Sequence, residues 1–196
     1  MKRNIITAIL MTVVTTVLVG FVYPMLVTGL AQVLFHDKAN GQLIVQDGKT
    51  IGSRIIAQPF TGAGYFHPRG SAAGNNGYDA ANSGGTNYGP TNQKFVDRVK
   101  TDVSAAQAEN PGKPIPADYV TTSASGLDPD ITPANAEFQT PRVAKERGIS
   151  EAQLTALVQQ HTEGRQFGFF GEPRVNVLEL NLDLDSKYPS RKQAFR

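Results

Sequence analysis

The hydrophobic pattern divides the chain near residue 36. Residues 5–35 contain no charged side chain and are rich in Ile, Val, Leu, Thr and Met, whereas polar and apolar residues are mixed along the remainder. A bilayer core about 30 Å thick requires roughly 20 apolar residues in helical conformation. The pattern therefore predicts a cytoplasmic stub and one transmembrane helix in residues 1–36, followed by one exported domain in residues 37–196.

A cleaved signal peptide is the alternative interpretation of the apolar run. Gly29-Leu30-Ala31 provides a small-x-small cleavage site. The apolar segment of a signal peptide is normally about 7–15 residues long, and the run before Ala31 is nearly twice that length, which favours an uncleaved anchor. Lys2 and Arg3 precede the run, so the positive-inside rule predicts a single-pass protein of the cell inner membrane with a cytoplasmic N-terminus and a periplasmic C-terminal domain.

Two positions inside the run are candidates for contact with partner helices. Gly20 has no side chain, so another helix could approach closely there. Pro24 has no amide hydrogen, and the carbonyl that it leaves without a donor can be satisfied by a neighbour. Gly20 and Gly29 are nine residues apart, which differs from the GxxxG spacing of many helix dimers. A plain anchor without helix partners remains the alternative.

The first part of the exported domain predicts a hairpin followed by a long loop. Residues 42–46 and 49–58 flank Asp47-Gly48, and Asp-Gly is a preferred type I′ turn. Residues 62–92 hold eight Gly, five Asn and two Pro, and such a long loop is usually functional or disordered. We expect this loop to be ordered by packing of its aromatic residues: Tyr65, Phe66, Tyr78 and Tyr88.

The next segments predict helices from their spacing and their caps. Apolar residues at positions 95, 96, 99 and 103 predict a helix over residues 91–108. Thr132-Pro133 and Thr140-Pro141 each place an N-cap before a proline, and they predict two separate helix starts. Ser150 predicts a third start, with Leu154, Leu157, Val158 and His161 on one face, and Gly148 suits the end of the preceding helix.

Two further segments predict strands, which together with the helices indicate a mixed α+β fold. Residues 119–122 form a short candidate strand. Over residues 174–185, leucines at 178, 180, 182 and 184 alternate with polar residues and predict a half-buried strand. Val175 and Val177 alternate in the opposite phase, so we expect a bulge near residues 177–178.

Charge and composition exclude several classes of protein. The net charge is +2, and Lys2 and Arg3 account for the whole excess, which argues against a nucleic-acid-binding domain. The chain has 40% hydrophobic residues, which argues against intrinsic disorder. Cysteine is absent, so a disulfide, a zinc-thiolate site and a cysteine nucleophile are impossible.

The motifs of common catalytic sites are incomplete. Gly48-Lys49-Thr50 matches the end of a phosphate-binding loop, but Leu43 stands where its first glycine is required. There is no GxSxG nucleophile motif. The chain has three histidines, and His67 in the long loop favours a hydrogen-bonded structural role. A catalytic zinc usually needs three protein ligands, and we expect no metal site.

Two charged groups allow a functional and a structural interpretation. Asp128 and Asp130 flank a proline and could bind a cation, but turn carboxylates more often cap backbone amides. Arg142, Lys145 and Arg147 form a basic cluster around Glu146. We expect that cluster to be a solvated helix face.

Four sequence blocks are distinctive when they are taken together. They are Tyr65-Phe-His-Pro-Arg69, residues 78–92, Ser125-Gly-Leu-Asp-Pro129 with Pro141-Arg-Val-Ala-Lys145, and residues 161–165 with 171–181. With the N-terminal helix, these blocks resemble the KdpC family, the C subunit of the bacterial high-affinity potassium-transporting ATPase. They occur in the family's order and extend over nearly the whole chain, and the departures are Gly70 in place of Pro and Asp130 in place of His.

The resemblance implies a non-catalytic accessory subunit of a potassium pump. Its partners would be a channel-like potassium-binding subunit, a P-type ATPase subunit and a very small membrane peptide. The family is described as a catalytic chaperone that raises the ATP affinity of the ATPase subunit. ATP is thus implied by the family alone, because the predicted topology places the folded domain on the opposite side of the membrane from ATP. The alternative is a stand-alone membrane-anchored exported enzyme or binding protein.

The long loop is also a candidate for partner contact. Eight glycines make its ordering costly in backbone entropy, and its aromatic residues could offset that cost. Tyr78 and Tyr88 could dock on a neighbouring subunit, as aromatic residues anchor many interfaces. Packing of both rings inside their own domain is the alternative.

Overall fold

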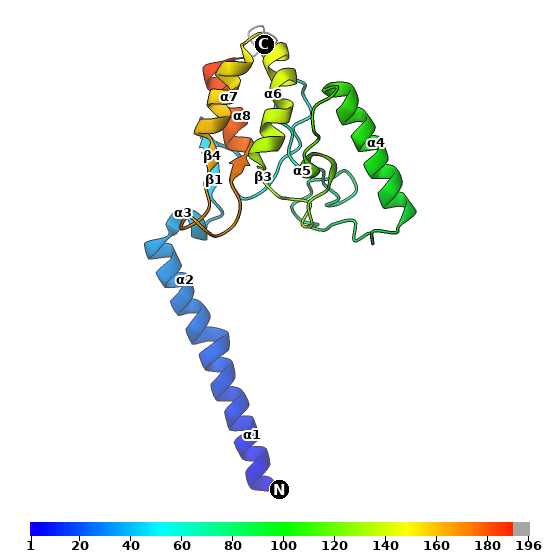
Figure 1. Ribbon diagram of the computed structural model, residues 1–196. Coiled ribbons are helices and arrows are strands. Elements are labelled where there is room, and N and C mark those ends of the chain that lie inside the picture. Colours follow the sequence, from blue (N-terminus) through cyan, green and yellow to red (C-terminus); the bar gives the residue numbers. More distant parts are fainter. Residues whose placement is uncertain (190–196) are drawn as a thin grey trace. The chain divides into compact units, whose positions relative to one another are not determined.

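The computed structural model describes residues 1–189, which form two compact units (Figure 1). The first unit is Met1–Ile51 and the second begins at Gly52. The mixed α+β composition agrees with the predicted fold class.

The first unit contains one long helix that is apolar enough to cross a membrane. It runs without a break over Lys2–Leu34, with a mean hydropathy of 2.5 in its most apolar window. It consists of α1 (Lys2–Thr15), a π-helical segment η1 (Thr16–Val22) and α2 (Tyr23–Leu34). At 1.5 Å per residue, 33 residues extend about 50 Å, which exceeds a bilayer core. The helix predicted from the apolar run is therefore confirmed.

The π-helical segment lies directly before Pro24. The amide of Tyr23 donates to the carbonyl of Leu18, five residues back, instead of four as in an α-helix. Pro24 has no amide to donate and disturbs the regular hydrogen-bond ladder at this point. The wider turns of η1 absorb that disturbance without ending the helix.

A short helix and the predicted hairpin complete the first unit. Helix α3 spans His36–Ala39, and strands β1 (Leu43–Gln46) and β2 (Lys49–Ser53) pair with each other. Asp47 and Gly48 have φ angles of 52° and 74°, as a type I′ turn requires at both central positions. The hairpin and its turn are confirmed, although β2 ends at Ser53 rather than at residue 58.

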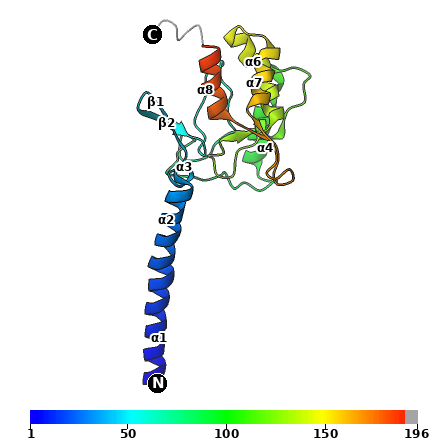
Figure 2. The same ribbon diagram turned by 90° about the vertical axis from the view of Figure 1, so that its left-hand side faces the viewer.

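The second unit combines helices with a small antiparallel sheet (Figures 1 and 2). The strand order is β3-β5-β4, and Val175 of the central strand lies opposite both Ile131 and Thr162. The helices are α4 (Gln93–Glu109), α5 (Ala117–Val120), α6 (Pro133–Arg147), α7 (Glu151–Gln160) and α8 (Val177–Lys187); the strands are β3 (Asp130–Ile131), β4 (Thr162–Glu163) and β5 (Arg174–Asn176).

The hydrophobic core lies between α6, α7, α8 and the central strand. It also receives Phe66 from the long loop, whose ring is fully buried. Ser150 caps α7 in a capping box with Gln153, so the predicted third helix start is confirmed. The main members of the core are Val143, Ala144, Leu154, Leu157, Val158, Val175, Leu180 and Leu184.

The strand predicted over residues 174–185 is wrong beyond Asn176. Asn176 is an N-cap that accepts from the amide of Glu179, and α8 begins at the place where we expected a bulge. The buried positions 177, 178, 180, 181 and 184 follow a helical repeat, not an alternating one. Leu182 is only half-buried, so the leucine alternation does not mark a single face.

Two other predicted elements are also corrected. Thr140-Pro141 does not start a helix, because α6 runs through Pro141 and its residues on both sides are buried. The start at Thr132 and the end at Gly148, with φ 69°, are confirmed. Residues 119–122 form no strand: α5 ends at Val120, and Thr122 makes an isolated bridge to Gly70.

The helix predicted over residues 91–108 is confirmed as α4, and the long loop contains no helix or strand within residues 62–92. Close approaches that only glycine permits order part of this loop. Gly126 has a φ of 69°, and a Cβ atom there would lie 2.7 Å from the carbonyl oxygen of Gly84. At Gly85 a Cβ atom would lie 2.7 Å from the carbonyl oxygen of Ala124.

Candidate functional site

The beginning of the long loop is bound by two buried amide side chains. Asn181 of α8 accepts from the amide of Phe66 at 2.9 Å and donates to its carbonyl at 2.9 Å. Gln139 of α6 accepts from the amide of His67 at 2.7 Å and donates to its carbonyl at 3.0 Å. The two amides therefore satisfy consecutive backbone groups much as a neighbouring strand would.

Two arginines of α6 hold the residues just before this point. The Arg142 guanidinium donates to the carbonyls of Ala63 at 2.6 Å and Tyr65 at 2.9 Å, and it pairs with Glu109 of α4 at 2.9 Å. The Arg147 guanidinium donates to the carbonyl of Gly64 at 2.7 Å. We call residues 63–67 the anchored segment, since side chains of α6 and α8 bind every one of its residues.

The Arg147 side chain is 1% exposed. It pairs with Asp185 of α8 at 2.7 Å, donates to the carbonyl of Tyr188 at 3.0 Å and lies 4.6 Å from the centroid of the Tyr65 ring. The Tyr65 hydroxyl donates to the other carboxylate oxygen of Asp185 at 3.0 Å. The expectation of a solvated basic face is therefore wrong for both arginines, and it holds only for exposed Lys145.

Burial of these groups changes their acid–base behaviour. His67 shares a hydrogen bond with the carbonyl of Gly62 at 3.0 Å, which confirms its structural role. Burial, followed by the nearby Arg142 charge, lowers the pKa of His67. Burial and the hydrogen bond to Glu109 raise the pKa of Tyr119, whose hydroxyl lies 2.7 Å from that carboxylate. Neither group is poised to exchange a proton near neutral pH.

The two aspartates beside Pro129 are engaged in ion pairs and turn contacts. Asp128 accepts from the amide of Asp130 at 3.1 Å and pairs with Arg69 at 3.0 Å, so the predicted backbone cap is confirmed. Asp130 pairs with Arg174 at 3.2 Å, and burial raises the pKa of its carboxyl group. Within residues 1–189, no group of three or more His, Asp or Glu side chains is arranged to hold a metal ion.

The structure places the predicted partner-contact residues in different environments. Tyr78 is half-buried, its hydroxyl donates to the carbonyl of Arg69 at 2.9 Å, and burial raises its pKa. Tyr88 is exposed at the surface of the loop. Gly20 and Pro24 belong to the spanning helix of the first unit, where no residue is buried within the chain. Partner contact by these four residues stays a prediction.

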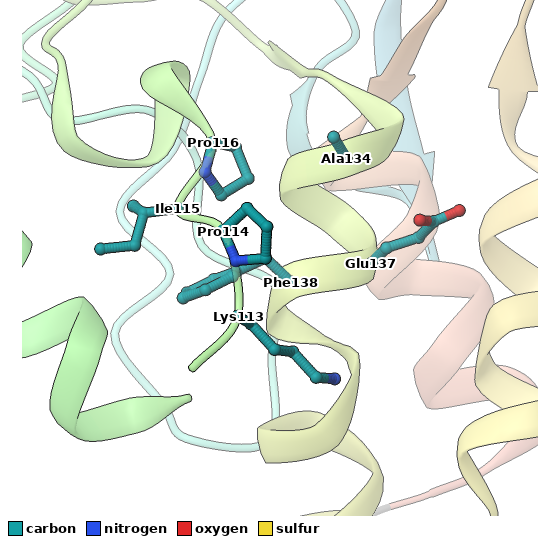
Figure 3. A pocket seen from close by; sticks show the side chains of 7 residues that line it. All are labelled: Lys113, Pro114, Ile115, Pro116, Ala134, Glu137 and Phe138. Carbon is teal, nitrogen blue, oxygen red and sulfur yellow. The ribbon is translucent and has the colours of Figure 1, made fainter. Parts of the chain in front are cut away.

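A cavity of about 340 Å³ lies between the proline-rich connector and α6 (Figure 3). The Phe138 ring belongs to its lining, and the two charged side chains in the lining, Lys113 and Glu137, have opposite signs. Pro114, Ile115, Pro116 and Ala134 complete the lining. The lining thus combines a mainly apolar surface with two charged side chains of opposite sign.

The sequence reasoning missed the arginine and amide contacts of the anchored segment. The available signal was the presence of Gln139 and Asn181 among apolar helix positions, because amides at core positions are normally hydrogen-bonded. The buried polar side chains of this region bind the chain's own backbone. Over residues 1–189, the fold and this site define a protein with one helix that is long and apolar enough to span a bilayer, and an α+β unit whose polar core residues maintain its structure.

Comparison with known proteins identifies the family. The family described as "KdpC: K+-transporting ATPase, c chain" matches residues 5–186. The chain is 74% identical to the potassium-transporting ATPase KdpC subunit of Koribacter versatilis over 96% of this chain and 97% of that protein. It is 57% identical to the KdpC subunit of Caulobacter vibrioides over 89% and 88%, and 53% identical to that of Rhodospirillum rubrum over 96% and 98%. The chain belongs to the KdpC family.

Proposed function

We propose that this chain is the C subunit of an ATP-driven potassium uptake complex, and that it assembles or stabilises the pump without catalysing a reaction itself. The observation that carries the proposal is the 74% identity to a KdpC subunit along nearly the entire length of both chains. The polar side chains of its core support a structural role, because Arg142, Arg147, Gln139 and Asn181 all bind backbone groups of the same chain.

The proposed topology places the N-terminus in the cytoplasm and residues 37–196 in the periplasm. Lys2 and Arg3, the first two residues of the helix over Lys2–Leu34, support this orientation. A reporter that works only outside the cytoplasm, fused after Arg196, should be active. Activity of a cytoplasm-specific reporter at the same position would contradict the orientation. The mass of the purified chain should show an uncut N-terminus, and loss of residues 1–31 would instead identify a signal peptide.

The proposed partners are a channel-like subunit, a P-type ATPase subunit and a small membrane peptide. In the proposed topology, the chain assists the ATPase subunit through the assembly and across the membrane rather than by direct contact with ATP. The central test is co-purification in mild detergent after expression with the other subunits. Stable recovery of the large membrane subunits is expected. Recovery of the tagged chain alone would favour a stand-alone exported protein.

Tyr88 and Tyr78 provide a matched pair for locating the interface. Exposed Tyr88 is the better docking candidate, so Tyr88→Ala should leave the melting temperature of the isolated chain unchanged and weaken recovery of the complex. Tyr78→Ala removes the hydrogen bond to the Arg69 carbonyl and should lower the melting temperature first. Normal assembly and normal growth of the Tyr88→Ala strain at low potassium would exclude a docking role.

A further inference from the structure

A turn joins β4 to β5 (Figure 1), and three phenylalanine rings in it are exposed. Phe167 is 88% exposed, Phe169 64% and Phe170 58%, and the rings of the last two form a pair with centroids 4.2 Å apart. We call residues 166–170 the aromatic tip. Most large apolar side chains of the second unit are buried, so a cluster of exposed rings at one tip indicates a surface that another apolar phase covers.

The backbone of the aromatic tip is hydrogen-bonded within the turn. The amide of Gln166 donates to the carbonyl of Phe170, and the amide of Phe170 donates back to that of Gln166, each at 2.9 Å. The amides of Gly168 and Phe169 also donate within the turn, at 3.1 and 3.2 Å. An apolar environment offers no partner for a free amide, so internal satisfaction of these groups is the condition for contact with lipid.

The conformation of the turn directs the rings outward. Phe167 has a φ of 53° and Gly168 a φ of 82°. The left-handed region is unfavourable for an aromatic residue, and packing within the chain does not compensate for it, because the Phe167 ring is almost fully exposed. The backbone of Phe167 is thus strained, and its ring makes no packing contact in the second unit that would offset the strain.

The charged residues that flank the aromatic tip neutralise one another. Arg165 pairs with Glu172 at 2.6 Å, and Arg174 pairs with Glu163 at 2.7 Å. The four side chains carry no net charge. The tip therefore lacks the basic surplus that attracts anionic partners, and its affinity has to come from the phenylalanine rings.

The strand that follows the aromatic tip is held within the second unit. Asn176, at the end of β5, donates to the carbonyl of Arg54 at 2.8 Å, and Arg54 pairs with Glu179 at 2.7 Å. These contacts hold the base of the turn inside the second unit, and the same chain carries a helix that is apolar enough to cross a membrane.

We propose that the aromatic tip inserts Phe167, Phe169 and Phe170 into the apolar boundary of the bilayer in which the chain is anchored. The partner is a lipid surface, zwitterionic as well as anionic, because the charges beside the tip are paired and four of its five backbone amides are hydrogen-bonded within the turn. Insertion gives the second unit a second attachment to the membrane besides the spanning helix. The inference requires no other subunit and holds on either side of the membrane.

The absence of tryptophan from the chain permits a direct test. The variant Phe169→Trp introduces one fluorophore at the aromatic tip, and Tyr88→Trp introduces one at an exposed aromatic position outside it. Each full-length variant is reconstituted through its own helix into phosphatidylcholine vesicles. Emission is measured with brominated acyl chains in the lipid, and separately with iodide present on both sides of the bilayer.

Insertion predicts several-fold stronger quenching of Phe169→Trp by brominated lipid than of Tyr88→Trp, and several-fold weaker quenching by iodide. Phe167→Trp should behave like Phe169→Trp. Iodide quenching equal to that of the Tyr88 variant, without an effect of brominated lipid, would overturn the proposal. Protection from both quenchers would also overturn it and would identify a protein surface as the occupant. These readouts use the chain alone, so they are independent of whether the complex assembles.

Discussion

Replacement of Arg147 by methionine tests whether the arginine contacts hold the second unit together. Methionine retains most of the length of the side chain and removes the guanidinium. The carbonyls of Gly64 and Tyr188 and the Oδ1 atom of Asp185 would lose the guanidinium as a donor, and Asp185 would keep only the Tyr65 hydroxyl on its other oxygen. Removal of one partner of a buried ion pair costs about 3–5 kcal/mol. The Asp185 side chain is 32% exposed and water can reach it, so we expect about 3 kcal/mol, at the lower end of that range.

Arg165→Met is the matched control. Arg165 also pairs with a carboxylate, Glu172, and at 2.6 Å the contact is no longer than the 2.7 Å of the Arg147 pair. The difference is exposure, since the two side chains of the control pair are 44% and 74% exposed. Exposed pairs contribute about 0–1 kcal/mol. The comparison thus separates the effect of burial from that of distance.

The measurement is thermal unfolding of the full-length chain in detergent, followed by near-ultraviolet circular dichroism of its tyrosines. In a domain of this size, 1 kcal/mol shifts the melting temperature by about 2–4 °C, so Arg147→Met should melt roughly 6–12 °C lower. Hydrogen exchange at the amides of Phe66 and His67 should increase as the anchored segment loosens. Equal melting temperatures for Arg147→Met and Arg165→Met would refute the reasoning.

Four further substitutions test the helix that replaces the predicted strand, the buried histidine and one close glycine contact. Leu180 is fully buried and Leu182 half-buried, so Leu180→Asp should cost several kcal/mol and Leu182→Asp much less; equal losses in urea unfolding would restore the strand. The lowered pKa of His67 means that the unfolded chain binds more protons below pH 6.5, so the free energy of unfolding should fall from pH 7.5 to 5.5. His67→Gln should remove that pH-dependent contribution, and an unchanged slope would exclude it. Gly126→Ala places a Cβ atom 2.7 Å from the Gly84 oxygen and should lower the melting temperature; an unchanged value would show that this approach is not tight.

The spanning helix, the hairpin and the helix caps could be predicted because their signals are local. Asp47-Gly48 adopts the turn that its residue types favour, and Ser150 forms the cap that its side chain permits. Such features depend on a few neighbouring residues and on solvent or lipid. They can therefore be predicted without knowledge of the tertiary contacts.

The elements that could not be predicted are those that tertiary contacts decide. Alternating leucines predict a strand over residues 174–185, but Asn181 must face inward to bind the backbone of Phe66, and a helix allows this together with burial of Leu180 and Leu184. Pro141 predicts a helix start, and the buried residues around it keep α6 continuous. Local preference is outweighed in both cases by the packing of distant residues.

The candidate site was harder to predict than the fold. Arg142 and Arg147 occur in a run of charged residues that is typical of a solvated surface, and only the position of the long loop shows what they bind. The residue types at positions 63 and 64 do not indicate that the carbonyls of Ala63 and Gly64 accept hydrogen bonds from arginines. An arginine that binds the backbone therefore cannot be distinguished by sequence pattern from one that faces solvent.

The π-helical segment has a consequence for the orientation of the anchor's two halves. A turn closed by a bond from Tyr23 to Leu18 accommodates one more residue than an α-turn. Each residue of an α-helix corresponds to about 100° of rotation, so η1 changes the rotational phase of α1 relative to α2. Deletion of one residue between Thr16 and Gly20 would change that phase by about 100° and turn a different side of α1 toward any neighbouring helix, with almost no change in hydrophobicity. The position of Pro24 therefore sets how far α1 is rotated relative to α2 about the helix axis.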